Sequence, residues 1–160
     1  MLANYVLLDL ETTGATPLRD RITEIALIRF QDGIEVARWQ TLVNPEINIP
    51  DFIQSLTGIS NEMVAAAPTF AKVAGELLDH LDGAVMCAHN VRFDHGFLKA
   101  EFKRIGITFK QRVLCTVKLS RKLYPEHKSH SLSALIERYR FTCTQRHRAM
   151  GDVEVMAQFI

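Results

Sequence analysis

Three apolar runs near the start of the chain have the length and spacing of β-strands. We expect these strands at residues 4–10, 22–30 and 34–43. The dipeptide Asp32-Gly33 separates the last two runs and is typical of a two-residue hairpin turn. Pro45 and Pro50 then interrupt the strand pattern. The first part of the chain therefore predicts an antiparallel, three-stranded portion of a sheet.

The remainder alternates helical periodicity with short apolar runs. Helices are expected after Ser60, from Pro68, and at residues 92–105, 116–124, 131–139 and from 151 onward. Two short buried strands are expected at residues 84–88 and 112–115. Strands that alternate with helices in this way are typical of parallel pairing. The pattern as a whole predicts a mixed α/β sheet of five strands with helices on both faces.

The 160 residues show no repeat, low-complexity tract or linker, so we expect a single domain at 1–160. The last expected helix runs to Ile160 without a capping residue, which favours an N-terminal piece of a longer protein. No apolar stretch is long enough to cross a bilayer, and no membrane association is expected. Three widely spaced cysteines among apolar neighbours are typical of reduced core thiols, and a cytoplasmic location is expected.

Charge is distributed unevenly although the net charge is +1. Residues 1–80 carry 5 Lys and Arg against 11 Asp and Glu, whereas residues 81–160 carry 14 against 7. Solvated helix faces would explain any one of these cations. Together they could neutralise a phosphate backbone, which favours a nucleic-acid partner.

Two carboxylates stand two positions apart at the end of the first apolar run. A strand places alternate side chains on the same face, so Asp9 and Glu11 project together with Leu7. Two negative charges at this spacing repel each other unless a cation neutralises them. A hard divalent cation held by oxygen ligands is the expected partner.

Two further aspartates fall on the apolar stripes of predicted helices. Asp94 precedes Phe97 and Leu98, and Asp152 precedes Met156, each at helical spacing. Either could be a helix cap, and Asp94 could form a buried salt bridge. Four acids on inward faces would need four basic partners, and the stripes contain no Lys or Arg. Divalent cations therefore explain the acids better than separate ion pairs do.

His147 lies five residues before Asp152. An imidazole is mostly unprotonated at neutral pH and can take a proton from water. Each of the other five histidines is expected to be a surface residue. Its proximity to Asp152 in the sequence makes His147 the candidate general base.

Three motifs resemble the DnaQ-like exonucleases, in the DEDD branch whose last motif contains histidine. The motifs are residues 9–14 (Asp-Leu-Glu-Thr-Thr-Gly), 88–94 (Ala-His-Asn-Val-Arg-Phe-Asp) and 147–152 (His-Arg-Ala-Met-Gly-Asp). Residues 56–59 and 68–70 also resemble the proofreading subunits of this family. The match spans nearly the whole chain, and all five functional positions are occupied.

The resemblance implies an RNase H-like sheet and two Mg²⁺ or Mn²⁺ ions. It assigns Asp9, Glu11, Asp94 and Asp152 to the metals and His147 to the base. Contacts to the terminal nucleotide are implied for Leu10, Thr12, Thr13, Leu56, Thr57, Asn90, Phe93 and His147. Phe93 could equally be core packing, and Asn90 could equally be a helix cap.

The expected reaction is release of nucleoside 5′-monophosphates from single-stranded or frayed 3′ ends of DNA, with a DNA polymerase subunit as a possible partner. An RNA exonuclease of the same superfamily is an alternative, since the metal chemistry does not distinguish the sugars. A non-catalytic nucleic-acid-binding module would be expected to have lost a site position, and none is lost. A small-molecule phosphatase would need a closed pocket.

Overall fold

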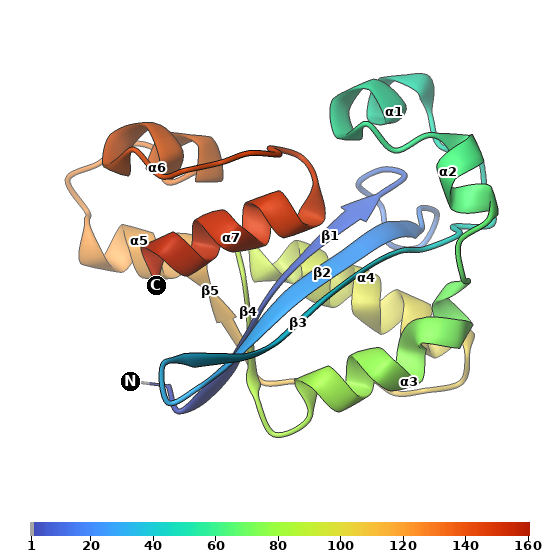
Figure 1. Cartoon of the computed structure of the whole chain (residues 1–160), viewed down its shortest axis with the longest axis horizontal. Coiled ribbons are helices and arrows are strands. Elements are labelled where there is room, and N and C mark those ends of the chain that lie inside the picture. Colours follow the sequence, from blue (N-terminus) through green and yellow to red (C-terminus); the bar gives the residue numbers. More distant parts are fainter. Residues whose placement is uncertain (1) are drawn as a thin grey trace.

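A computed structural model describes residues 2–160 as one five-stranded sheet with helices on both faces (Figure 1). The strand order across the sheet is β3-β2-β1-β4-β5. The strands are β1 (Asn4–Thr12), β2 (Ile22–Gln31), β3 (Ile34–Leu42), β4 (Val85–Ala88) and β5 (Val113–Cys115). This arrangement confirms the mixed sheet predicted from the sequence.

The first three strands form an antiparallel meander, and the last two add in parallel to β1. Asp32 and Gly33 both take left-handed backbone conformations, with φ of 49° and 80°. A two-residue hairpin turn of the primed type needs positive φ at both positions, and asparagine, aspartate and glycine adopt it most readily. The expected turn between β2 and β3 is therefore confirmed.

Seven helices connect and cover the strands within the described residues. They are α1 (Asp51–Thr57), α2 (Asn61–Ala65), α3 (Phe70–Leu81), α4 (Val91–Arg104), α5 (Thr116–Leu123), α6 (Leu132–Tyr139) and α7 (Ala149–Phe159). The side chain of Ser131 caps α6 by accepting a hydrogen bond of 3.1 Å from the backbone of Ala134, as expected.

Three helices differ from the sequence expectation, and one of them, α3, begins at Phe70, two residues after Pro68. Helix α1 was not predicted, because its seven residues between Pro50 and Gly58 are too few for a helical repeat of apolar positions to stand out. Helix α7 begins two residues earlier than predicted. The backbone N–H of Ala149 donates a hydrogen bond of 2.9 Å to the Glu24 carboxylate on β2. Local periodicity does not reveal this partner, because it is distant in the sequence.

Alternation along β1 separates two cores. Val6, Leu8 and Leu10 pack with α3 and α4 on one face, whereas Leu7 packs with α6 and α7 on the other. Asp9 and Glu11 follow Leu7 at alternate positions and so continue the second face of β1, against which α7 packs. The strand pleat therefore sets the position of the first two acids. Among the described residues no helix combines the length and apolarity needed to cross a membrane.

Gly151 lies in the first turn of α7, where the helix passes close to the preceding loop. A Cβ at this position would overlap the carbonyl oxygen of Gln145, whereas a Cβ on Gly75 of α3 would meet nothing within 4 Å. The two helical glycines therefore make a matched pair.

We expect Gly151→Ala to destabilise the protein by about 1–3 kcal/mol, because backbone cannot yield as a flexible side chain can. Gly75→Ala should be neutral or stabilising by up to about 1 kcal/mol, because alanine favours an exposed helix. Urea unfolding of both variants measures the difference. Equal effects of the two substitutions would contradict the close approach.

Candidate active site

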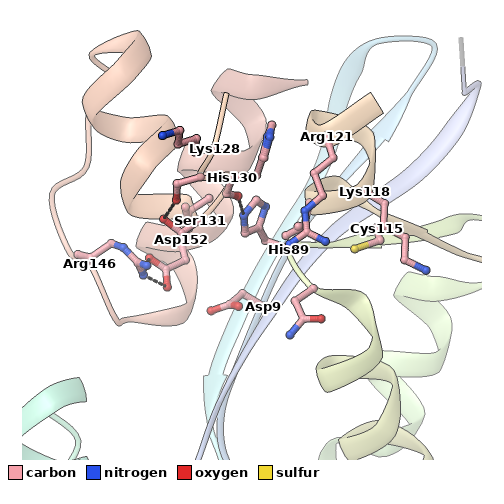
Figure 2. A pocket seen from close by; sticks show the side chains of 14 residues that line it. Asp9, His89, Cys115, Lys118, Arg121, Lys128, His130, Ser131, Arg146 and Asp152 are labelled. Carbon is pink, nitrogen blue, oxygen red and sulfur yellow. Dashed lines mark hydrogen bonds and ion pairs between the residues drawn. The ribbon is translucent and has the colours of Figure 1, made fainter. Parts of the chain in front are cut away.

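Three carboxylates from two distant segments meet at the end of β1. Asp9 and Glu11 come from the strand and Asp152 from the first turn of α7. One ligand oxygen from each lies within 4.8 Å of the others. Figure 2 shows Asp9 and Asp152 facing the same cavity from opposite sides. The same-face pair and the inward aspartate of α7 are thus brought together.

Asp94 completes the acidic group from the opposite side of β1. It lies in the first turn of α4 and is only 2% exposed. The nearby backbone N–H groups of Asp94 itself and of Leu10 lower the pKa of its carboxyl against the larger effect of burial, yet its Oδ1 has no hydrogen-bond partner among the described residues. Oδ2 of Asp9 is also buried without a partner in the described chain. Neither a salt bridge nor a cap therefore accounts for Asp94.

Burial and mutual repulsion raise the pKa of these acids. For Asp9 burial is the main cause, followed by the charges of Asp94 and Glu11, and the pKa lies well above its usual value. Burial, with Asp152 and Glu24 nearby, raises the pKa of Glu11 to about 8. Burial also raises the pKa of Asp94. Without a cation, the site holds more negative charge than it can stabilise.

Arg146 supplies one compensating charge that the sequence analysis did not anticipate. Its Nη1 donates to both Asp152 carboxylate oxygens, at 2.9 and 2.8 Å. The expectation that none of the acids has a basic partner is therefore wrong for Asp152. Arg146 lies in the loop before α7 and on no apolar stripe, so helical periodicity does not reveal it. Burial still outweighs this pair, and the pKa of Asp152 is raised.

A second, partly buried ion pair holds the start of α7 against β2. Arg148 donates to both carboxylate oxygens of Glu24, at 3.1 and 2.7 Å, and Glu24 also accepts the Ala149 backbone N–H. Glu24 pairs across the sheet with Glu11. The contact therefore fixes the helix that carries Asp152 against the strand pair that carries Glu11.

His147 lies in the turn between these two arginine pairs. Its backbone adopts a left-handed conformation with φ of 65°, and its side chain is partly exposed. Its proximity lowers the pKa of the Asp152 carboxyl, in addition to the larger lowering effect of Arg146 and against the still larger effect of burial. In the described chain it lines neither of the two cavities at the acids, and it stays a predicted base.

A small cavity of about 300 Å³ adjoins the acids on the side of α1. Five of the residues expected to contact the terminal nucleotide line it: Leu10, Thr12, Leu56, Thr57 and Phe93. Phe52 and Ile53 of the unpredicted helix α1 also line it. Pro50 before α1 and the left-handed Gly58 after it are the sequence signals that could have located this helix.

Thr13 and Asn90 do not line the small cavity. Thr13 is buried. Its hydroxyl donates a hydrogen bond of 3.1 Å to the Asp20 carboxylate and accepts one from the backbone N–H of Arg21, so it stabilises the loop after β1. Asn90 occupies the N-cap position of α4 in a left-handed conformation but makes no side-chain cap bond. It faces a second, larger cavity. Phe93 both lines the small cavity and packs near Phe97, with ring centroids 4.8 Å apart.

The second cavity, about 610 Å³, begins at Asp9 and Asp152 and extends along α5. Lys118, Arg121 and Lys128 line it (Figure 2). His89 and His130, expected on the surface, instead hold its wall by hydrogen bonds. His89 contacts Thr116 and the His130 carbonyl, both at 2.8 Å, and His130 contacts Ser120 at 2.8 Å.

The donor set fits divalent cations. All four acids offer carboxylate oxygens, which hard cations such as Mg²⁺ and Mn²⁺ prefer over nitrogen or sulfur. Two buried oxygens, on Asp9 and Asp94, have no partner in the described chain. A buried carboxylate oxygen without a partner is costly, and cation binding would remove that cost.

Comparisons with known proteins show which sequences this chain resembles. A sequence model described as Exonuclease, of the RNase T type, matches residues 6–160. The chain is 38% identical over 154 residues to a PolC-type DNA polymerase III from Caldanaerobacter subterraneus, covering 96% of this chain and 11% of that protein. It is 41% identical over 153 residues to the 3′-5′ exonuclease DinG of Bacillus subtilis, covering 94% of this chain and 16% of that protein. The chain thus spans less than a fifth of the length of these relatives.

Solved structures show the same fold. Exonuclease X in complex with 5′-overhanging duplex DNA superimposes with a TM-score of 0.76 at 28% identity, over 96% of this chain and 86% of that one. A zinc-bound Escherichia coli exonuclease I complex with single-stranded DNA gives a TM-score of 0.88 at 20% identity, over 99% and 40%. The resemblance to DnaQ-like nucleases in the motifs is confirmed, and the chain belongs to the exonuclease family.

Proposed function

We propose that this chain is a metal-dependent 3′-5′ exonuclease domain that removes nucleoside 5′-monophosphates from DNA 3′ ends. The observation that carries the proposal is the meeting of Asp9, Glu11 and Asp152 within 4.8 Å, with Asp94 buried beside them. The relatives support the polarity, because DinG is named a 3′-5′ exonuclease. The PolC-type relatives support a proofreading context, and a polymerase subunit is the proposed partner.

Asp9, Glu11, Asp94 and Asp152 would hold two divalent ions, Mg²⁺ or Mn²⁺. Ions held there would supply stabilisation of the charge that develops on a phosphodiester during hydrolysis. Residues of the chain itself would bind the nucleotide and accept the proton. Leu10, Thr12, Leu56, Thr57 and Phe93 would hold the terminal nucleotide in the small cavity. His147, in the turn before α7, would accept the proton of the attacking water.

DNA is proposed over RNA because the solved relatives are described with DNA. The residues around the acids do not themselves select the sugar, since the same carboxylates serve either backbone. Comparing digestion rates of matched DNA and RNA oligonucleotides separates the two substrates. A faster rate on RNA would identify the chain as an RNA exonuclease of the same family.

Three variants test the reaction. Asp9→Asn and Asp152→Asn should reduce turnover of a single-stranded oligonucleotide by at least about a thousandfold, since each removes a proposed metal ligand. His147→Ala should retain Mn²⁺ binding and lose about 100- to 10,000-fold in rate, the usual contribution of a general base. Gel analysis of product lengths measures the rate of turnover, and calorimetric titration with Mn²⁺ measures metal binding. Turnover by Asp9→Asn at the parental rate would overturn the mechanism.

Charge repulsion predicts how the metal-free protein responds to pH. The folded-state pKa of Glu11, about 8, lies above its ordinary value of 4.5, so the folded protein holds this proton more tightly. The stability that results is complete below about pH 4.5 and is lost as the pH rises toward 8. The pKa values of Asp9 and Asp94 are shifted in the same direction.

We therefore expect the melting temperature of the metal-free protein to fall between about pH 5 and pH 8, and to fall less in Glu11→Gln. Mn²⁺ should raise the melting temperature more at the higher pH, because it binds the ionised acids. Thermal unfolding with and without Mn²⁺ measures this. If the melting temperature depends on pH identically in the parent and in Glu11→Gln, the pKa of Glu11 is not raised in the folded protein.

Arg146 should compete with the metal for Asp152. Its Nη1 is shared between both oxygens of a carboxylate that the proposal assigns to a cation, and its charge compensates that carboxylate. Arg146→Gln should therefore tighten Mn²⁺ binding by roughly three- to tenfold, equivalent to about 0.7–1.4 kcal/mol. Lys122→Gln, with the same change in net charge on the exposed α5, is the control. Weaker Mn²⁺ binding by Arg146→Gln would instead make Arg146 a supporting residue of the site.

A further inference from the structure

Two cavities of opposite character meet at the acids. The smaller is lined largely by apolar residues of α1 and the end of β1, including Phe52 and Leu56, and contains Glu11. The larger contains Asp9 and Asp152 and is otherwise lined by cationic and neutral side chains. Since the oxygens of Glu11, Asp9 and Asp152 lie within 4.8 Å, the acids mark the junction of the two cavities.

This order fixes a direction for a bound strand, on the basis of the proposed function. Hydrolysis that releases a 5′-monophosphate cuts on the 5′ side of the terminal nucleotide. If that nucleotide occupies the small apolar cavity, the scissile phosphate lies at the acids. The larger cavity also adjoins the acids, so the next phosphates toward the 5′ end would lie along it.

Lys118, Arg121 and Lys128 are placed to meet those phosphates. All three are exposed, face the larger cavity and form no ion pair among the described residues (Figure 2). The acids in the lining are Asp9 and Asp152, at its inner end. A row of free cations beyond the acids is the charge pattern that a phosphodiester backbone requires.

The wall that carries these cations is held in place by the histidine network. The His130 carbonyl accepts 2.8 Å from Nε2 of His89, and Nδ1 of His130 accepts from the Ser120 hydroxyl on α5. His130 Nε2 donates 3.0 Å to the carbonyl of His127, one residue before Lys128. The loop with Lys128 is thus tied both to α5 and to the end of β4. Because the backbone that carries the cations is already fixed, only their side chains lose freedom when they bind an anionic strand.

We propose that Lys118, Arg121 and Lys128 form an upstream-strand subsite, which binds the phosphates on the 5′ side of the scissile bond without reading base identity. Backbone contacts of this kind position a strand and carry no sequence information. The subsite should make affinity depend on substrate length and on salt. It should act equally on DNA and RNA, because both present the same phosphodiester.

The test compares the triple variant Lys118→Gln, Arg121→Gln, Lys128→Gln with the control Lys72→Gln, Lys103→Gln, Lys122→Gln. Both remove three exposed cations, but the control residues lie on α3, α4 and α5 and none lines the described cavity. Binding of 5′-fluorescein oligothymidylate and oligouridylate of about twelve nucleotides is followed by anisotropy in an Asp9→Asn background, which prevents turnover. Hydrolysis of the thymidine dinucleotide and of the longer oligothymidylate is measured with Asp9 intact.

For the subsite variant, we expect affinity for both long oligonucleotides to fall roughly ten- to a hundredfold at about 50 mM salt. The slope of log K against log salt should flatten by about 2, or about 0.7 for each lost cation on a single strand. The control should change far less. Hydrolysis of the dinucleotide should stay near the parental rate, because its single phosphate lies at the acids.

Equal losses in the two triple variants would overturn the subsite in favour of diffuse attraction. An unchanged salt slope, or an equal loss on the dinucleotide, would also overturn it. These outcomes are separable from failure of the proposed function, in which the parent hydrolyses neither substrate. A selective loss of binding would then still support the subsite as a nucleic-acid contact.

Discussion

Repulsion among buried carboxylates is the constraint on which the rest of the site depends. The fold places Asp9, Glu11, Asp94 and Asp152 close together. In addition to burial, the charges of Asp94 and Glu11 raise the pKa of Asp9, and the charge of Asp152 raises the pKa of Glu11. Such a cluster is unfavourable by itself and favourable only with positive charge beside it. Arg146 provides one charge, at the edge of the group, and leaves oxygens of Asp9 and Asp94 without partners in the described chain. Divalent cations provide the rest of the proposed compensation.

Tertiary contacts, and not local preference, hold this unfavourable arrangement in place. Strand pairing through β2 fixes the end of β1, and the Glu24–Arg148 pair ties α7 to that strand pair. On the other face, α4 packs Phe97, Leu98 and Phe102 into the larger core and so presents Asp94. The free energy of burying these apolar groups offsets the cost of the acids. Activity and stability are therefore expected to oppose each other at this site, as they often do where strained groups serve a reaction.

Much of the site could be predicted because its residues follow simple periodicities. A strand period of two placed Asp9 with Glu11, and a helical period placed Asp94 and Asp152 inward. The Asp32-Gly33 turn and the Ser131 cap were predictable from local backbone chemistry. The motif resemblance then indicated the family, which the matched family model shows. Features that depend on contacts between distant residues were not predictable in this way. Helix α1 is only seven residues long, and the Arg146 pair spans a loop. His89, after β4, meets the carbonyl of His130, before α6, only in the folded protein.

The central claim is that the four carboxylates together bind divalent cations. Anomalous diffraction from crystals grown with Mn²⁺ and a nucleoside 5′-monophosphate tests it most directly. The account predicts manganese peaks contacting Asp9, Glu11, Asp94 and Asp152, with the Arg146 guanidinium displaced from Asp152. Crystals that bind the nucleotide but show no manganese at these oxygens, with Arg146 still paired to Asp152, would contradict it.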